Sequence, residues 1–598
     1  MPEYLAPGVY VEETSFRAKS IEGVGTSTTA FVGPTRKGPF RTGEAARETP
    51  ELLTSYGDFE RIYGSYSDLD LGAGVPSTNY LGHAVLAFFN EGGSRLYVSR
   101  VVGAGSERAS ARVSADGAPA AQQISFVARF PGTFANARPG IPGRGEVTVR
   151  EISSPASPAT MAAAPAGTLL FTNAVNGISR HVKVGGAWHP AGTPADPAED
   201  AAALGAAAAA PLIVTLAVTV TDADGSVISF DDMGYDATHP RWVAHVMAAT
   251  PSRRSDHLQN AFAIAVGAGV TGLALHDALF DGAVANAQGQ LERTFQFSGG
   301  TDGSAPALAD YTLALGEIAS LEDVSIVAAP GSQAYGDAQA AQSINGLLIS
   351  HAEARRAYRI AVLDTQPQLT PGQAREARGR MDSTYAALYF PWIVVANPNA
   401  RAGRDDIPRE ITLPPSGFVC GIFARNDVER GVFKAPANEV VRGAVRFEID
   451  VNFGQQEMLN PIGVNCLRLL SGRGYRLWGA RLASSDPEFK YVNVRRYLSY
   501  LEASIDRGTQ WAVFEPNGER LWANVRQTIS DFLYTEWRNG ALLGTTTDEA
   551  YFVRCDRSTM TQNDLDNGRL VCLIGVAIIK PAEFVIFRIG QKTADARS

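Results

Sequence analysis

The chain has 598 residues, too many for one simple domain, and 45% of them are hydrophobic, enough for more than one core. Its 53 basic and 62 acidic residues give a net charge of −9, which argues against nucleic acid as the main partner. The N-terminal sequence lacks the basic and apolar segments of a signal peptide, and no run of about 18 apolar residues predicts a membrane span. We therefore expect several domains, no direct membrane insertion and synthesis in the cytoplasm.

The four cysteines, Cys420, Cys466, Cys555 and Cys572, have no CxxC spacing. The absence of that spacing and of any Cys/His cluster gives no support for a metal site. Two interpretations stay open: four reduced and mostly buried thiols, or a disulfide between subunits of an extracellular particle.

The first block runs from Met1 to Val102 and alternates short strands with a helix. Strands are predicted at Val9–Glu12, after a Pro-Gly turn, at Thr29–Val32 and at Leu96–Val101. Leu81–Phe89 has apolar residues at helical spacing and is followed by Asn-Glu-Gly-Gly, which predicts a helix and its end.

The second block, from Gly103 to Arg254, is rich in Ala, Gly and Pro. Strand-like runs are found at Gln123–Val127, Glu146–Val149, Thr168–Phe171 and Leu212–Val220. This pattern indicates a β-rich inserted domain with long loops, and such loops suit a solvent-facing position.

The third block, from Ser255 to Asn460, alternates apolar strand runs with helical patterns. Buried strands are predicted at Asp323–Ala329, Tyr358–Leu363 and Trp392–Ala396, and a helical stripe precedes the first of them. Such alternation is typical of a mostly parallel α/β sheet.

The last block, from Pro461, contains two amphipathic helices, one along Val494–Ile505 and one along Leu521–Leu533. Strands are predicted at Ala550–Cys555, Arg569–Ile579 and Glu583–Ile589. The triplet Asp566-Asn567-Gly568 resembles a hairpin turn, since Asn-Gly accepts positive φ easily.

Three patterns raise the possibility of enzyme or ligand chemistry. Gly267–Gly272 is a literal GxGxxG, but no clear second strand with an acidic end follows, so a turn is favoured over a dinucleotide site. Asp323, His351 and a serine could form a triad, yet no GxSxG occurs and no histidine follows residue 351. Asp564–Gly568 lacks the spacing and the final glutamate of a calcium loop. We expect no enzymatic activity, no cofactor and no metal.

Two sets of residues are better candidates for contacts between subunits. Arg425, Asp427, Arg430 and Lys434 are either ordinary surface charges or a salt-bridge network between subunits or to a tube. The Glu583–Ile589 strand is apolar on both faces, so it must be covered. Either it pairs within its own chain, or it adds to the sheet of a neighbour by β-augmentation.

Several tracts resemble the contractile tail sheath proteins of phages and contractile injection systems. The N-terminal tracts are Ala6–Glu13, Thr26–Gly33 and Phe88–Gly93; the central ones are Ser298–Gly303 and Pro414–Glu439; the C-terminal ones are Gly463–Cys466, Leu477–Arg481, Tyr491–Arg496, Trp511–Asn517, Leu521–Trp522, Gly540–Gly544 and Lys580–Val585. The second block carries no clear similarity.

The resemblance implies an α/β fold: a subtilisin-like α/β core and an α+β C-terminal domain, with the inserted β-rich domain and extended terminal arms. The expected boundaries are 1–22 for the N-terminal arm, 23–102 with 255–460 for the core, 103–254 for the inserted domain, 461–582 for the C-terminal domain and 583–598 for the C-terminal arm. The arm strands would be Val9, Tyr10, Val11 and Glu12, and Phe584, Val585, Ile586, Phe587 and Arg588.

The family implies a subunit that polymerises helically around an inner tube and contracts to drive the tube through a target envelope. Its partners would be copies of itself, the inner tube protein, baseplate proteins and a tail-terminator or cap protein, in a phage tail or an injection particle. The alternative is a non-contractile baseplate or tail-terminator component that shares the C-terminal domain.

Overall fold

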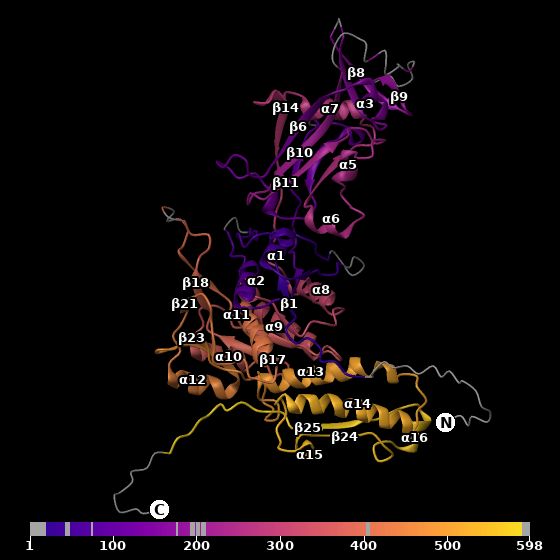
Figure 1. Ribbon diagram of the computed structural model, residues 1–598. Helices are drawn as coiled ribbons and strands as arrows, with labels where there is room; N and C mark the ends of the chain where they lie inside the picture. Colours follow the sequence, from indigo (N-terminus) through magenta and orange to yellow (C-terminus); the bar gives the residue numbers. More distant parts are fainter. Residues whose placement is uncertain are drawn as a thin grey trace, which may run out of the picture.

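The computed structural model describes residues 20–41, 48–72, 76–115, 117–174, 177–191, 198, 204, 211–401, 403 and 407–588. The molecule is elongated and consists of three stacked parts (Figure 1). We name them the central unit (residues 28–103 and 304–483), the distal unit (104–303) and the C-terminal unit (492–580). Within the described residues, no helix is both long enough and apolar enough to cross a membrane.

A nine-stranded sheet forms the centre of the molecule. Its six middle strands are parallel, and the strands at its two edges are antiparallel to their neighbours. In spatial order the strands are β2 (Leu52–Leu53), β3 (Leu96–Arg100), β1 (Thr29–Gly33), β15 (Ile326–Ala328), β16 (Ile360–Asp364), β17 (Ala386–Phe390), β22 (Val464–Leu470), β23 (Gly474–Leu477) and β20 (Glu439–Val440).

Helices cover both faces of this sheet. The helices of the central unit are α1 (Tyr56–Tyr63), α2 (Tyr80–Glu91), α8 (Leu308–Ile318), α9 (Ala338–Glu353), α10 (Pro371–Arg378), α11 (Pro415–Arg430) and α12 (Phe453–Leu459). Phe31 of β1 packs into the core with α2 and α11, whereas its neighbours Ala30 and Val32 pack into the core with α8, α9 and α10. Because both faces are buried, these strands are apolar without alternation, as is usual for parallel sheets.

Helices α2 and α11 approach each other closely because glycines lie between them. A Cβ atom on Gly417 would lie 2.7 Å from the Cα of Ala84, and one on Gly421 would lie 2.7 Å from the carbonyl oxygen of Phe88. The two glycines are four residues apart and therefore share one face of α11. Their small size explains why this helix can bury its whole first three turns.

The distal unit has its own core, built from an eight-stranded and a three-stranded antiparallel sheet. The larger sheet runs β13 (Val284–Ala285), β14 (Leu291–Gln296), β6 (Glu146–Pro155), β10 (Leu212–Thr221), β7 (Leu169–Ala174), β8 (Gly177–Val184) and β9 (Ala187–Pro190), with β11 (Val227–Met233) also on β10; the smaller runs β12 (Phe262–Val266), β5 (Ile124–Ala128) and β4 (Ser110–Arg112). Among the described residues of this unit, short helices accompany the sheets: α3 (Pro158–Ala163), α5 (Val243–Val246), α6 (Arg254–Gln259) and α7 (Gly272–Phe280).

The expected boundary at residue 254 falls inside the distal unit. β12 pairs with β5, and β14 pairs with β6, so residues 262–296 belong to the sheets of this unit. The chain enters and leaves the unit at adjacent positions, because the amide of Ser304 donates a hydrogen bond of 2.9 Å to the carbonyl of Ala104. The chain therefore enters and leaves the unit through a neck of two neighbouring segments.

The C-terminal unit packs two long helices on a two-stranded sheet. Its elements are α13 (Val492–Gly508), α14 (Glu519–Arg538), α15 (Thr547–Ala550), β24 (Tyr551–Arg554), α16 (Gln562–Asp566) and β25 (Leu573–Val576). The apolar stripe predicted for α14 lies in one core cluster with residues of both strands, together with Leu501 and Ile505 of α13; Val494 and Leu498 of the predicted α13 stripe are outside this cluster. The predicted Asn-Gly hairpin turn is wrong: Asn567 ends α16, and Gly568 with φ 68° follows it.

Two expectations for the central unit also need correction. The segment predicted at Trp392–Ala396 is β18 (Ile393–Ala396), but it pairs antiparallel with β19 (Glu410–Leu413) and β21 (Ala444–Phe447) in a separate sheet. The parallel strand between β16 and β22 in the central sheet is β17, which the sequence did not predict. The boundary expected at residue 461 comes too early, since β22 and β23 complete the central sheet.

Candidate subunit-assembly site

The predicted C-terminal strand is not paired within its own chain over its described part. Residues 581–588 contain no strand, and Figure 1 shows this segment leaving the body of the molecule. Its apolar side chains are 68–82% exposed: Phe584, Val585, Ile586 and Phe587. Four consecutive exposed apolar residues are unfavourable in water and mark a segment that needs a covering surface.

The segment begins at a polar anchor centred on Glu583. The guanidinium of Arg481 donates to both carboxylate oxygens of Glu583, at 2.6 and 2.7 Å, and Arg481 is itself 8% exposed. Asn460 and the Tyr491 hydroxyl each donate a further hydrogen bond of 2.8 Å to the same carboxylate. Such charge-assisted bidentate pairs are geometrically specific, so the direction in which the segment leaves is fixed.

The surroundings of Glu583 favour its charged form. Burial alone would raise the pKa of this carboxyl, but the hydrogen bonds from Arg481, Asn460 and Tyr491 outweigh burial and lower the pKa to about 2. The anchor is therefore ionised at any pH at which the protein would normally work.

A second anchor holds the chain just after the N-terminal arm. The Thr26 hydroxyl donates 2.7 Å to Asp427 on α11, and Arg496 on α13 donates 3.0 Å to the Thr26 carbonyl. Nearby, Ile21 packs against Gly508, so this stretch lies between the central and C-terminal units. The predicted arm strand Val9–Glu12 lies outside the described residues.

The charged set predicted on the Pro414–Glu439 run lies mostly inside the chain. These residues are on helix α11 and the loop after it, not on an extended segment. Arg425 pairs with Glu91 at 2.5 Å, with side chains 8% and 1% exposed. Asp427 pairs with Arg496 at 2.5 Å, both 3% exposed. These two pairs join α11 to α2 and α13, so the side chains of Arg425 and Asp427 are engaged within their own chain.

Lys434 and Arg430, the other two members of the set, are more exposed than Arg425 and Asp427. Lys434 forms an ion pair with Glu439 in the same chain, with both side chains about one-fifth exposed. Arg430 is at the exposed end of α11. Of the four predicted residues, Arg430 is therefore the one best placed to contact another subunit.

The sheet β24–β25 offers two edges that no other described strand occupies. Tyr551, Val553 and Ile574 pack towards the helices, whereas Phe552 and Leu573 on the other face are 45% and 51% exposed. A two-stranded sheet is marginal by itself and gains stability from added strands. Its edges therefore present free backbone groups close to exposed apolar side chains.

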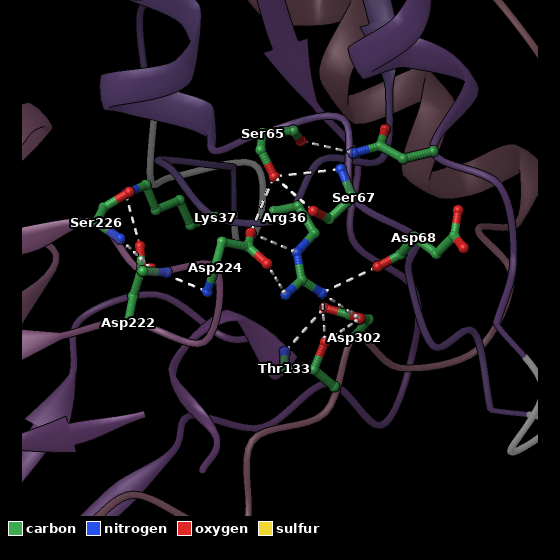
Figure 2. A network of polar contacts seen from close by, with 12 residues as sticks. Arg36, Lys37, Ser65, Ser67, Asp68, Thr133, Asp222, Asp224, Ser226 and Asp302 are labelled. Carbon is green, nitrogen blue, oxygen red and sulfur yellow. Dashed lines mark hydrogen bonds and ion pairs between the residues drawn. The ribbon is translucent and has the colours of Figure 1, made fainter. Parts of the chain in front are cut away.

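A network of buried charges joins the distal unit to the central unit (Figure 2). Arg36 lies at its centre, with a side chain 4% exposed. Its guanidinium contacts Asp224 at 3.4 Å, Asp302 at 3.9 Å, the Thr133 hydroxyl at 2.7 Å and the Asp68 carbonyl at 3.0 Å. Because the partners come from both units, the network fixes the angle at the neck.

The patterns considered for enzyme chemistry do not form reactive sites. Gly267–Gly272 does join a strand to a helix, but β12 is antiparallel to β5, and a Cβ on Gly267 would collide with the Ala121 carbonyl. Asp323 bonds Arg95 and Tyr97, whereas His351 contacts Arg359, so the proposed triad is not assembled. Among the described residues, no cluster of metal-ligating side chains occurs.

Comparison with known proteins connects this geometry to a family. The model of the phage tail sheath protein central domain matches residues 306–481, and that of the phage tail sheath C-terminal domain matches residues 484–592. These two regions of the chain are thus similar to the two domains of phage tail sheath proteins. The boundary between the two sheath domains coincides with the end of the central sheet, and the second domain includes the exposed segment.

Similar sheath proteins cover different shares of the chain. A prophage major tail sheath protein of Pseudomonas aeruginosa (strain UCBPP-PA14) is 26% identical over 270 residues, 44% of this chain and 64% of the relative. The tail sheath protein of Enterobacteria phage T4 is 26% identical over 29% of this chain and 26% of its own length. The aligned part thus spans less than two thirds of either relative.

One solved structure extends the similarity of fold to the whole chain. The helical sheath of the anti-feeding prophage in its contracted state has a TM-score of 0.51 and 20% sequence identity, and the match covers 99% of this chain and 100% of that one. The mixed α/β fold is thus that of a sheath subunit, including the part that carried no sequence similarity.

Proposed function

We propose that this chain is the structural subunit of a contractile sheath, which polymerises helically around an inner tube and shortens to drive the tube through a target envelope. The observation that carries the proposal is the anchored, exposed apolar segment Phe584–Phe587. A strand that finds no cover within its own chain can be completed by a second copy. Such a contact is heterologous and does not close, so repetition builds a helix.

The acceptor in our proposal is the β24–β25 sheet of a neighbouring subunit. It has free edges, and the exposed side chains of Phe552 and Leu573 match the apolar arm in character. The outer edges of the nine-stranded sheet, by contrast, are the two-residue strands β2 and β20, which offer little backbone for pairing. The N-terminal arm, with Val9–Glu12, is proposed to contribute in the same way.

Contraction requires rigid bodies with links that survive repacking. Buried ion pairs at Arg36, Arg425 and Asp427 support rigid bodies, because breaking such pairs within a subunit is costly. The arm would supply the link, since backbone hydrogen bonds in an augmented sheet persist while other contacts change. Arg430 is proposed to form contacts that exchange between the two packings.

The finer assignments follow from this arrangement. We propose that the central unit corresponds to the subtilisin-like core, supported by its parallel sheet covered on both faces, and that the distal unit is an inserted domain facing outward. The partners would be an inner tube protein, a baseplate and a terminator or cap protein. The protein would be made in a bacterial cytoplasm and function in a phage tail or injection particle, without enzymatic activity.

Electron microscopy of the protein expressed alone tests the proposal. Hollow helical tubes wide enough to surround an inner tube are expected. Closed rings alone, even with a tube protein co-expressed, would instead favour the non-contractile baseplate or terminator component. Deleting residues 105–303 with a short linker, which the adjacent positions of Ala104 and Ser304 permit, should leave tube formation intact.

A further inference from the structure

Two of the four cysteines face each other at the end of the β24–β25 pair. The ladder pairs Tyr551 with Val576 and Arg554 with Leu573, and one further step in this register pairs Cys555 with Cys572. Both side chains belong to the core cluster of the C-terminal unit. The pairing therefore places two sulfur atoms side by side, although they are far apart in the sequence.

The position of the two cysteines in the β24–β25 ladder suits a disulfide bond. The amide of Ala577 donates 2.8 Å to the carbonyl of Ala550, which makes that position a hydrogen-bonded pair. Hydrogen-bonded and non-hydrogen-bonded pairs alternate along an antiparallel ladder, so Cys555 and Cys572 occupy a non-hydrogen-bonded pair. Cα atoms of such pairs are about 4.5 Å apart, within the range that disulfides span.

We propose that Cys555 and Cys572 form an intrachain disulfide when the protein meets a small disulfide oxidant such as glutathione disulfide. Both side chains point to the helix side of the hairpin, where Cys555 is 1% exposed and Cys572 is half-buried. The bond would close the open end of the β24–β25 pair and hold its two strands together.

An arginine-rich hollow lies beside this pair. An open hollow of about 550 Å³ beside α14 has Cys555 in its wall together with three arginines, Arg520, Arg526 and Arg557. Only two acidic residues, Glu519 and Asp556, share the same lining. A tripeptide disulfide with several carboxylates fits this charge balance.

The reaction balances as a thiol–disulfide exchange. The Cys572 thiolate, the more exposed of the two, attacks one sulfur of glutathione disulfide and releases one glutathione thiolate. The Cys555 thiolate then attacks the Cys572 sulfur of the mixed disulfide and releases the second glutathione. The protein loses two electrons and two protons, the electrons reduce the oxidant, and the protons pass to the two glutathione thiolates or to solvent.

Burial of the two thiols slows the thiol–disulfide exchange. It raises the pKa of the Cys555 thiol, and it raises the pKa of Cys572 to about 12, with Arg526 and Asp556 the charged groups beside the pair. Both thiols are therefore protonated at neutral pH, which slows the exchange. The bond would form slowly after release from a reducing cytoplasm and not during synthesis.

Peptide mapping of the full-length protein tests the proposal directly. The reduced protein is incubated with glutathione disulfide, quenched in acid, alkylated and digested without reductant. A linked Cys555–Cys572 peptide should accumulate, whereas Cys420 and Cys466 should stay free thiols, because they are 0% and 1% exposed and lie on opposite faces of the central sheet. Four free thiols in the folded protein, or a bond to Cys420 or Cys466, would overturn the proposal.

A substitution separates the two steps. With Cys555→Ser, the exchange should stop at a stable glutathione adduct on Cys572, seen as an added glutathione mass that reductant removes. In the wild type, cleavage after the exposed Arg569 should leave both fragments joined on a non-reducing gel. Absence of the adduct, or fragments that separate after oxidation, would contradict the mechanism.

The effect on assembly rests on the proposed sheath function. Oxidised subunits should form tubes that resist dissociation better than reduced ones, because the acceptor strands cannot separate. If no tubes form under either condition, the sheath proposal fails while the peptide map still decides the disulfide. If the bond forms and both kinds of tube dissociate equally, the assigned consequence is wrong.

Discussion

Strand β17 and the C-terminal segment have similar apolar sequences and opposite environments. Every residue of β17, Ala386–Phe390, is fully buried, because neighbouring strands and helices on both faces cover it. Phe584–Phe587 are 68–82% exposed, although apolar residues in such a run are normally buried, as those of β17 are. The difference shows that the chain covers its central strands completely and leaves the apolar segment Phe584–Phe587 exposed.

The largest expected effect follows from removing that segment. Truncation after Glu583 keeps the anchor with Arg481 and removes the apolar residues, so the subunit should fold and remain soluble but form no tubes. The measurement is electron microscopy combined with circular dichroism. Substitution Arg588→Gln, which leaves the four apolar residues in place, is the control and should still assemble. Tubes of normal length from the truncated protein would refute the arm contact.

The second prediction compares a buried and an exposed charge on helix α11. Asp427→Asn leaves Arg496 buried without its counter-charge, which should destabilise the subunit by about 3–5 kcal/mol. Arg430→Gln should change stability by less than about 0.5 kcal/mol, because the side chain is exposed. Urea denaturation monitored on the C-terminal helices measures both.

The same pair of variants also distinguishes fold from assembly. Arg430→Gln should lower the yield of tubes while leaving urea denaturation unchanged. If it assembles normally, Arg430 has no lattice role; if Asp427→Asn is as stable as the wild type, the buried pair does not join the two units.

A third, smaller effect is expected where helices α2 and α11 touch. Gly417→Ala inserts a Cβ 2.7 Å from the Cα of Ala84, and such overpacking typically costs about 1–3 kcal/mol. Gly346→Ala on α9 is the matched control, since nothing lies within 4 Å of its Cβ position and alanine favours a helix by about 1 kcal/mol. The midpoint temperature of thermal unfolding should therefore fall for Gly417→Ala and rise for Gly346→Ala. Equal shifts would contradict the close packing.

The smallest effect concerns the anchor and its pH dependence. The pKa of Glu583 is about 2 in the folded protein, below its ordinary value of 4.5, so ionised Glu583 stabilises the anchor above about pH 4.5. That contribution is lost as the pH falls from 4.5 towards 2. The protection factors of the amides around Glu583, which are corrected for the intrinsic pH dependence of exchange, should therefore fall over this range in the wild type.

Glu583→Gln serves as the control for that measurement. Its exchange at these amides should already be faster at neutral pH and should show no such acid transition beyond the intrinsic pH dependence of exchange. An identical pH profile for both proteins would show that Glu583 does not carry the effect.

The sequence predicted the elements of the centre well, because local patterns determine them. Periodicity identified β1 and α2 to within two residues, and it identified α13 and α14 with ends two to five residues short. It missed β17, a short apolar run that ends at Pro391, and it placed β18 in the wrong sheet. Strand pairing depends on contacts between distant segments, which periodicity does not contain.

The same limit applies to the assembly residues. The sequence identified the C-terminal segment as one that needs cover, because its apolar residues would lie on both faces of a strand, although residues 581–588 form no strand within their own chain. The roles of Arg425 and Asp427 were not, because their partners Glu91 and Arg496 are distant in the sequence and become neighbours only when α11 packs. Glu583 was missed as an anchor for the same reason, although it lies within a recognised tract.

A structure of the assembled tubes by cryo-electron microscopy tests the central claim most directly. The account predicts that Phe584–Phe587 of each subunit form an added strand on the β24–β25 sheet of a neighbour, with their side chains buried. Tubes in which this segment folds back on its own subunit, or remains exposed to solvent, would contradict it.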